Sequence, residues 1–159
     1  MNKKISRCIS TATIILSLMS GQSFAEVLVV GSQGPIANNI ANHFNQETGA
    51  YIGQQNEGDL LYVHVATATD IELDSVKKSI INKNLVVLDM TGYTSEDIRS
   101  SKTKDLIGMG VSAPVIIKGV SKGKPLTNFV VSNPTSENPE ENINKTVLHE
   151  LENNFEFKG

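Results

Sequence analysis

Residues 26–44 read EVLVVGSQGPIANNIANHF, which places a short apolar run directly before a helical pattern. The run is continuous rather than alternating, as is typical of a strand buried on both faces. Pro35 is favoured in the first turn of a helix, and Gly49 is the expected end of that helix. Its apolar residues recur at intervals of four: Ile36, Ile40 and Phe44. The stretch therefore predicts a buried strand followed by a helix, the repeating unit of a parallel α/β sheet.

The same alternation continues to the end of the chain. Apolar runs predict strands, and apolar residues at helical spacing predict helices. The further predicted elements are a strand at 60–66, a helix at 69–80, a strand at 85–89, a helix at 94–107, strands at 114–120 and 126–131, and a helix at 138–155. The two strands joined by a short glycine-containing segment predict a β-hairpin. The prediction is one α/β domain with a mostly parallel central sheet, helices on both faces, and a C-terminal β-hairpin plus helix.

The segment GVSAPVIIK at 110–118 resembles the one that leads into the terminal hairpin of the thioredoxin-like fold. Members of that superfamily carry a proline there, usually in cis, and the order of predicted elements also resembles theirs. Their redox motif would fall where this chain has Thr69-Asp70-Ile71-Glu72, which contains no cysteine. The resemblance therefore implies a redox-inactive relative. It also implies a surface around Pro114 and the Thr69 loop where relatives bind an extended peptide.

A flavodoxin- or Rossmann-like doubly wound sheet is the alternative fold. It gives weight to the turn Gly31-Ser32-Gln33-Gly34, because a glycine turn and the following helix N-terminus can bind a phosphate. The turn has the spacing G-x-x-G rather than the dinucleotide fingerprint G-x-G-x-x-G. The next predicted strand also ends at Ala66-Thr67 without an acidic residue. An ordinary strand-to-helix turn is therefore the favoured interpretation.

Residues 1–25 have the three zones of a secretory signal peptide. They contain basic residues near the start, an apolar run at 9–19, and the small-x-small sequence Ser23-Phe24-Ala25. The apolar run is too short to span a bilayer comfortably. Cleavage after Ala25 is therefore expected, leaving a single domain at 26–159 with no integral membrane segment. We expect this domain to act in the periplasm or to be secreted further.

Charge and cysteine content exclude several functions. The chain has 14 basic and 17 acidic residues, and the signal removes three basic residues and no acidic ones. The mature chain therefore carries 11 basic against 17 acidic residues, a formal charge of −6. That balance gives no support for nucleic-acid binding, which requires clustered cations. Cys8 is the only cysteine and leaves with the signal, so the mature chain has no thiol chemistry and no disulfide.

The histidines do not predict a metal site. His43, His64 and His149 show no H-x-H, H-x-x-x-H or HExxH spacing, so neither a metal nor another cofactor is expected. His64 is interpreted as a hydrogen-bonded structural histidine. Ser32 lies on a strand-to-helix turn, as a hydrolase nucleophile would, with His149 and Asp89 as candidate partners. The nucleophile-elbow spacing G-x-S-x-G is absent.

Two charged groups have structural explanations. Thr69 and Glu72 have the spacing of a capping box, which explains the acidic first turn of that helix without catalysis. Lys118, Lys122 and Lys124 lie on the predicted hairpin. They are interpreted as protection of an exposed sheet edge, or as a patch that attracts an acidic partner.

The sequence is therefore best explained by a non-catalytic, exported accessory factor that binds a protein or peptide of the cell envelope or secretion machinery. The expected mechanism is backbone pairing beside Pro114. The candidate binding residues are Thr69, Asp70, Tyr93, Ala113, Pro114, Lys118, Lys122 and Lys124. The alternative is a small periplasmic hydrolase or an anion- or nucleotide-binding protein that uses the turn Gly31–Gly34.

Overall fold

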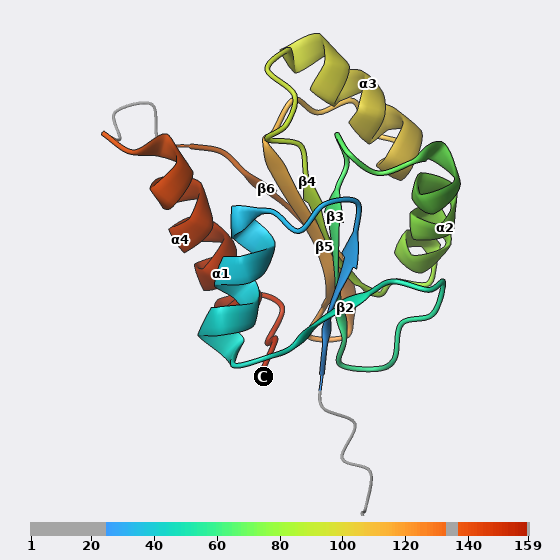
Figure 1. Ribbon diagram of the computed structural model, residues 1–159, viewed down its shortest axis with the longest axis vertical. Helices are drawn as coiled ribbons and strands as arrows, with labels where there is room; N and C mark the ends of the chain where they lie inside the picture. The colour runs from blue at the N-terminus through green and yellow to red at the C-terminus, as the bar shows by residue number, and fades with distance from the viewer. Residues whose placement is uncertain (1–24, 133–136, 159) are drawn as a thin grey trace, which may run out of the picture.

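The computed structural model describes residues 25–132 and 137–158, and these form six strands and four helices (Figure 1). In chain order they are β1 (Val27–Val30), α1 (Pro35–Phe44), β2 (Thr48–Ala50), β3 (Leu60–His64), α2 (Asp70–Ile81), β4 (Leu85–Asp89), α3 (Glu96–Ile107), β5 (Val115–Ser121), β6 (Lys124–Val130) and α4 (Pro139–Asn153). The signal-peptide prediction falls on residues 1–25, of which 1–24 lie outside the described residues.

All six strands form one mixed sheet in the order β2-β1-β3-β4-β5-β6. The pairs among β2, β1, β3 and β4 are parallel, whereas β5 and β6 are antiparallel to their neighbours. Val29 of β1 lies between Ala50 on one side and Tyr62 on the other. The predicted mostly parallel sheet with a C-terminal hairpin and helix is thereby confirmed.

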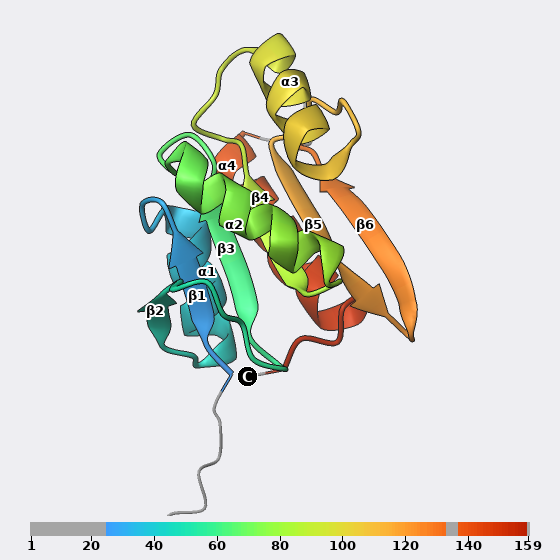
Figure 2. The same ribbon diagram turned by 90° about the vertical axis from the view of Figure 1, so that its right-hand side faces the viewer.

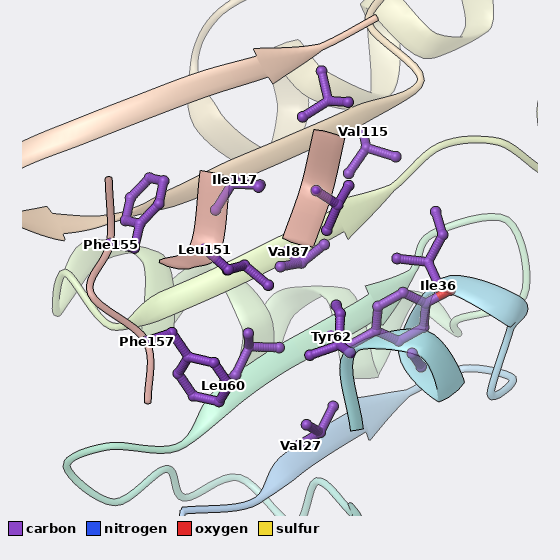
Figure 3. Packing of buried hydrophobic residues seen from close by; sticks show 14 of the residues in the cluster. Val27, Ile36, Leu60, Tyr62, Val87, Val115, Ile117, Leu151, Phe155 and Phe157 are labelled. Carbon is purple, nitrogen blue, oxygen red and sulfur yellow. The ribbon is translucent and has the colours of Figure 1, made fainter. Parts of the chain in front are cut away.

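The helices cover both faces of the sheet, as predicted. Helices α1 and α4 pack on one face, and α2 and α3 on the other (Figures 1 and 2). On the α1 and α4 side, Tyr62 lies among the apolar side chains of neighbouring strands, while Leu151 and Phe157 close the layer from the C-terminal segment (Figure 3). The C-terminal segment is held beneath the core by a hydrogen bond from the Phe157 N–H to the Leu151 carbonyl, 2.9 Å long.

The first helix is shorter than predicted. It ends at Phe44, because Asn45 takes the left-handed conformation (φ 53°) and its N–H caps the carbonyls of Ala41 and Asn42. Gly49, the predicted helix end, instead lies in β2, a three-residue strand that the sequence analysis missed. Strand β2 has no alternation of apolar residues of its own, so only its pairing with β1 defines it.

Strand β2 determines the topology. The chain crosses from β1 through α1 to β2 on one side, and then returns to the opposite side of β1 to form β3. An order of 2-1-3-4-5 is that of a doubly wound sheet, whose direction of winding reverses between β1 and β3. The carboxyl ends of these two strands therefore diverge into helices on opposite faces.

The hairpin β5–β6 has a two-residue turn. Lys122 and Gly123 both have positive φ values, 49° and 76°, which two-residue hairpin turns of the primed type require. Strand β6 is the last of the sheet, so no described strand pairs with its outer side. Pro114 directly precedes β5, and no cis peptide bond occurs within the described residues, so the Ala113–Pro114 bond is trans.

Candidate functional site

The turn after β1 contacts the turn after β3 through three polar side chains. Ser32 Oγ lies 2.7 Å from His64 Nδ1 and 3.0 Å from Thr67 Oγ1, and the Ser32 N–H donates to Thr67 Oγ1 at 2.8 Å. Both turns follow the carboxyl ends of neighbouring parallel strands, at the point where the winding reverses. The prediction of a hydrogen-bonded His64 is confirmed, and its partners are Ser32 and Thr67.

Gly31 makes this close approach possible. Its φ is +75°, and a Cβ there would lie 2.7 Å from Thr67 Oγ1 and 2.8 Å from the His64 carbonyl oxygen. Both the backbone conformation and the lack of space exclude a larger residue. Helix α1 has Gly34 as its N-cap, with no side-chain cap and no acidic residue in its first turn. Pro35 has no N–H, and the Asn38 N–H donates to the Gly34 carbonyl at 3.2 Å, so the first turn offers only the N–H groups of Ile36 and Ala37 to an anion.

Below this turn, Tyr62 and Asp89 form a buried polar pair. The Tyr62 hydroxyl donates to Asp89 Oδ2 at 2.5 Å, and Asp89 Oδ1 accepts from the Thr91 N–H and hydroxyl. Burial, and then the neighbouring Asp89 carboxylate, raise the pKa of the Tyr62 phenol far above its usual range. The phenol therefore remains a protonated donor at neutral pH.

The hydrolase arrangement considered from the sequence does not form. Ser32 meets His64, while His149 lies on α4 and contacts Asn153 through its Nδ1. Both carboxylate oxygens of Asp89 already accept hydrogen bonds from Tyr62 and Thr91. The chemistry of the turn is thus a serine–histidine pair without the expected acid. No group of three or more potential metal ligands occurs within the described residues.

The structure separates the predicted partner-binding residues into groups. Thr69 and Asp70 begin α2, where Thr69 and Glu72 form the predicted capping box, so that prediction is confirmed. Tyr93 follows β4 and donates through its hydroxyl to the Val65 carbonyl at 3.2 Å. Ala113 and Pro114 precede β5. Because β4 lies between β3 and β5, the strand that leads to the Thr69 loop and the strand that follows Pro114 are about 10 Å apart in the sheet.

The backbone beside Pro114 is already largely bonded. Thr103 Oγ1 accepts from the Val111 N–H and donates to the Val111 carbonyl, both at 2.8 Å. The Arg99 Nε donates to the Ser112 carbonyl at 2.6 Å, and the Pro114 carbonyl accepts from the Met90 N–H. Few backbone groups there remain for an added peptide.

A surface pocket of about 410 Å³ adjoins this segment. Its lining combines the predicted binding residues with the end of β6, and consists of Thr91, Glu96, Arg99, Ser112, Ala113, Pro114, Val131, Ser132 and Ile143. The pocket therefore connects the predicted Pro114 surface to the open edge of the sheet.

The outer strand of the hairpin, β6, is a further candidate feature, and it agrees with the exposed sheet edge that the sequence predicted for the hairpin. Next to a two-residue turn, paired residues exchange both backbone hydrogen bonds, and the pattern then alternates along the hairpin. Given the register, Thr127 and Phe129 direct their N–H and carbonyl groups away from β5, toward the open side. The Phe129 and Val131 side chains are 43% and 61% exposed. The sequence predicted the exposed edge but did not single out Thr127, Phe129 or Val131.

Of the three hairpin lysines, Lys122 and Lys124 lie near the turn at the other end of this edge, whereas Lys118 is on the inner strand β5. Lys118 Nζ donates to Thr127 Oγ1 at 3.3 Å, and Lys122 and Lys124 lie at the hairpin turn. The register places the turn at the end of β5 opposite Pro114. The hairpin edge is thus basic near its turn and apolar near Val131.

The fold and the surface define an α/β domain with a doubly wound parallel core and one long open edge strand. The chain is 38% identical over 138 residues to the "Cytolysin secretion protein" of Vibrio vulnificus (strain CMCP6). The match covers 87% of this chain and 82% of that protein, and the chain belongs to its family. No family model and no solved structure matches the chain. Among the described residues, no helix is both long and apolar enough to cross a membrane.

Proposed function

We propose that this protein is a non-catalytic, exported accessory factor that binds an extended segment of another exported polypeptide and assists its secretion. The similarity to a protein named for cytolysin secretion, over most of both chains, is the observation that carries this proposal. The sequence features of a signal peptide support export. The periplasm is the compartment in which such a factor would meet its partner.

The open edge of β6 is the surface we assign to this binding. An added strand would use the outward backbone groups of Thr127 and Phe129, as in other cases of strand addition to a sheet edge. Pairing beside Pro114 itself is less favourable, because β5 already pairs with strands on both sides. Pro114 instead contributes to the pocket at the end of β6.

The side chains along the edge suggest the chemistry of the partner. Phe129 and Val131 favour apolar residues at one end of the bound segment, and the lysines favour acidic residues at the other. We therefore propose a partner segment in which apolar and acidic residues occupy opposite halves. The acidic half of such a segment would lie beside the basic residues near the hairpin turn.

The doubly wound strand order supports a flavodoxin-like arrangement over a thioredoxin-like one. The trans bond before Pro114 and the position of β2 both favour this alternative. The proposed binding surface does not depend on the choice, because it rests on the antiparallel hairpin β5–β6 as this structure has it.

Photo-cross-linking in cells tests the proposal. Benzoyl-phenylalanine replaces Phe129 in one variant and Ile52 in a control, since Ile52 is 85% exposed and follows β2 at the opposite edge of the sheet. We expect the probe at 129 to capture an exported polypeptide that mass spectrometry identifies, and the probe at 52 to capture far less of it. Deleting the gene should then deplete that polypeptide from the culture medium.

A charged substitution at the β6 edge tests the effect of this surface on secretion. Phe129→Glu in the restored gene should fail to recover secretion, because a carboxylate would replace the apolar contact, whereas Ile52→Glu should recover it. Equal recovery by both variants, or capture of the polypeptide equally at both positions, would exclude the β6 edge. Unchanged secretion after deletion would exclude the accessory role altogether.

A second candidate function is anion binding or hydrolysis at the turn Gly31–Gly34. The 2.7 Å contact between Ser32 and His64, beside an uncapped helix N-terminus at the winding reversal, favours it. Inorganic phosphate and nucleotides should then raise the melting temperature, and Ser32→Ala should abolish the rise. A melting temperature that is flat across all these ligands would remove this candidate.

A further inference from the structure

The start of β1 contains a buried carboxylate without a cation. The Glu26 N–H donates to Asp59 Oδ1 at 3.0 Å, and the Asn56 N–H donates to Asp59 Oδ2 at 2.8 Å. Asp59 is only 4% exposed. None of the ion pairs within residues 25–132 and 137–158 includes it. Two backbone donors thus satisfy the Asp59 carboxylate, and no described cation pairs with it.

Nearby lysines do not fill this role. Lys83 and Lys158 line the same pocket of about 540 Å³ as Asp59, together with Glu57 and Glu156. Neither ammonium group lies within 4.0 Å of the Asp59 carboxylate. A buried carboxylate is costly unless a cation and hydrogen bonds both satisfy it. The site therefore has the hydrogen bonds but lacks the cation.

Within residues 25–132 and 137–158, Glu26 is the first residue with a backbone hydrogen bond. The Glu26 carbonyl accepts from the Leu60 N–H at 2.9 Å, and the Val27 N–H donates to the Glu47 carbonyl at 3.0 Å. Ala25, the preceding residue, lies outside β1 and beside Gly58. The peptide bond that the small-x-small sequence marks for cleavage therefore lies directly before Glu26, whose backbone is hydrogen-bonded to Asp59 and Leu60.

We propose that cleavage of the Ala25–Glu26 bond supplies the missing cation, because the new α-ammonium group of Glu26 pairs with Asp59. This inference rests on the proposed export of the chain. A signal peptidase hydrolyses the bond with one water molecule, whose oxygen joins the carboxylate of Ala25 and whose two hydrogens join the nitrogen of Glu26. The neutral N–H that contacts Asp59 becomes a charged donor at the same atom, so the processed domain is more stable than its precursor.

Two purified chains test the inference. One begins at Glu26, released from a fusion by a protease that leaves no extra residue, and the other begins at Ala25, which keeps a neutral amide at Glu26. We expect the first chain to melt about 4 °C higher. In Asp59→Asn the difference should disappear, whereas in Glu57→Gln, a matched change in the same pocket, it should persist.

Acetylation covers the case in which Asp59→Asn does not fold. In the chain that begins at Glu26, acetylation of the α-amino group keeps the Glu26 N–H as a hydrogen-bond donor and removes its positive charge. The melting temperature should then fall to that of the chain beginning at Ala25. Equal melting temperatures of the free and acetylated chains would overturn the inference. These measurements use purified protein, so they do not depend on cleavage in the cell. N-terminal sequencing of the protein from cells tests that cleavage separately.

Discussion

The hydroxyl of Tyr62 lies 2.5 Å from Asp89 Oδ2 and joins strands β3 and β4 beneath the turn that begins α1. Tyr62 is fully buried and Asp89 is 2% exposed. The pKa of the Tyr62 phenol is raised, so the phenol is protonated at neutral pH and donates to the Asp89 carboxylate. Asp89 in turn holds the Thr91 backbone, which orders the turn after β4. The buried Tyr62–Asp89 pair thus lies between the core and two surface turns, the one before α1 and the one after β4.

Tyr62→Phe should destabilise the domain by about 1–3 kcal/mol, because it removes one donor from the buried Asp89 carboxylate. The measurement is the midpoint of urea unfolding with an unchanged slope. Tyr51→Phe is the matched control, since the Tyr51 hydroxyl bonds Ser79 at 2.9 Å in a partly buried site without a carboxylate. A loss for Tyr62→Phe no greater than that of the control would contradict the role assigned to the pair.

Gly34→Ala should be destabilising by about 1–3 kcal/mol in the natural chain and close to neutral in the Tyr62→Phe background. A Cβ at position 34 would lie 2.7 Å from the Tyr62 hydroxyl, whereas its next contacts are at 3.8 Å. The φ of Gly34 is −87°, so alanine fits the backbone. A double-mutant cycle of unfolding free energies checks this. Additive effects of the two substitutions would show that the hydroxyl is not the obstacle.

Thr69→Ala should cost about 1 kcal/mol, because it removes the N-cap of α2. Glu72→Gln should cost little at pH 7, since glutamine can also complete a capping box. The Thr69 backbone N–H, followed by its hydroxyl, lowers the pKa of Glu72 below 4.5. Its contribution is therefore present above pH 4.5 and is lost as the pH falls through the lower, folded-state pKa.

Urea unfolding of the natural chain and of Glu72→Gln at pH 7 and at pH 3 measures this pH dependence. The two chains should differ less at pH 3 than at pH 7. A difference that grows toward acid would reverse the sign that we derive.

Removing the charges of Lys122 and Lys124 should lower cross-linking at position 129 by roughly two- to fivefold without unfolding the domain. Asparagine is the suitable replacement at 122, because the φ of 49° there favours it over alanine. Glutamine replaces Lys124. Lys145→Gln on α4 is the control. An unchanged yield, with circular dichroism confirming the fold, would remove the hairpin turn from the binding surface.

The elements that the sequence predicted well have a periodicity or a cap of their own. Strands β3 and β4 are continuous apolar runs, and α2 begins with the capping box of Thr69 and Glu72. Strand β3 ends at His64 rather than at 66, because the N–H groups of Thr67 and Ala68 turn back to the His64 carbonyl. Local sequence patterns thus predict strands and helices of this kind, whereas the residue at which an element ends depends on the hydrogen bonds of the turn that follows it.

The candidate site was less predictable because it depends on strand order. The contact of Ser32 with His64 joins residues 32 positions apart, and it follows from β1 lying beside β3. That order is fixed by β2, which has no periodicity to predict it. The open edge likewise exists because β6 is the last strand, a property of the whole sheet rather than of residues 124–130.

The two outer strands of the sheet differ greatly in length. Strand β2 has three residues and β6 has seven, so only one side of the domain offers a template long enough for another chain. The molecule is in this sense monovalent. A complex formed through strand addition would contain one bound segment per protein, and pairing between two copies would end at a dimer instead of continuing into a filament. A domain with one such edge could thus hold one extended segment without nucleating an aggregate.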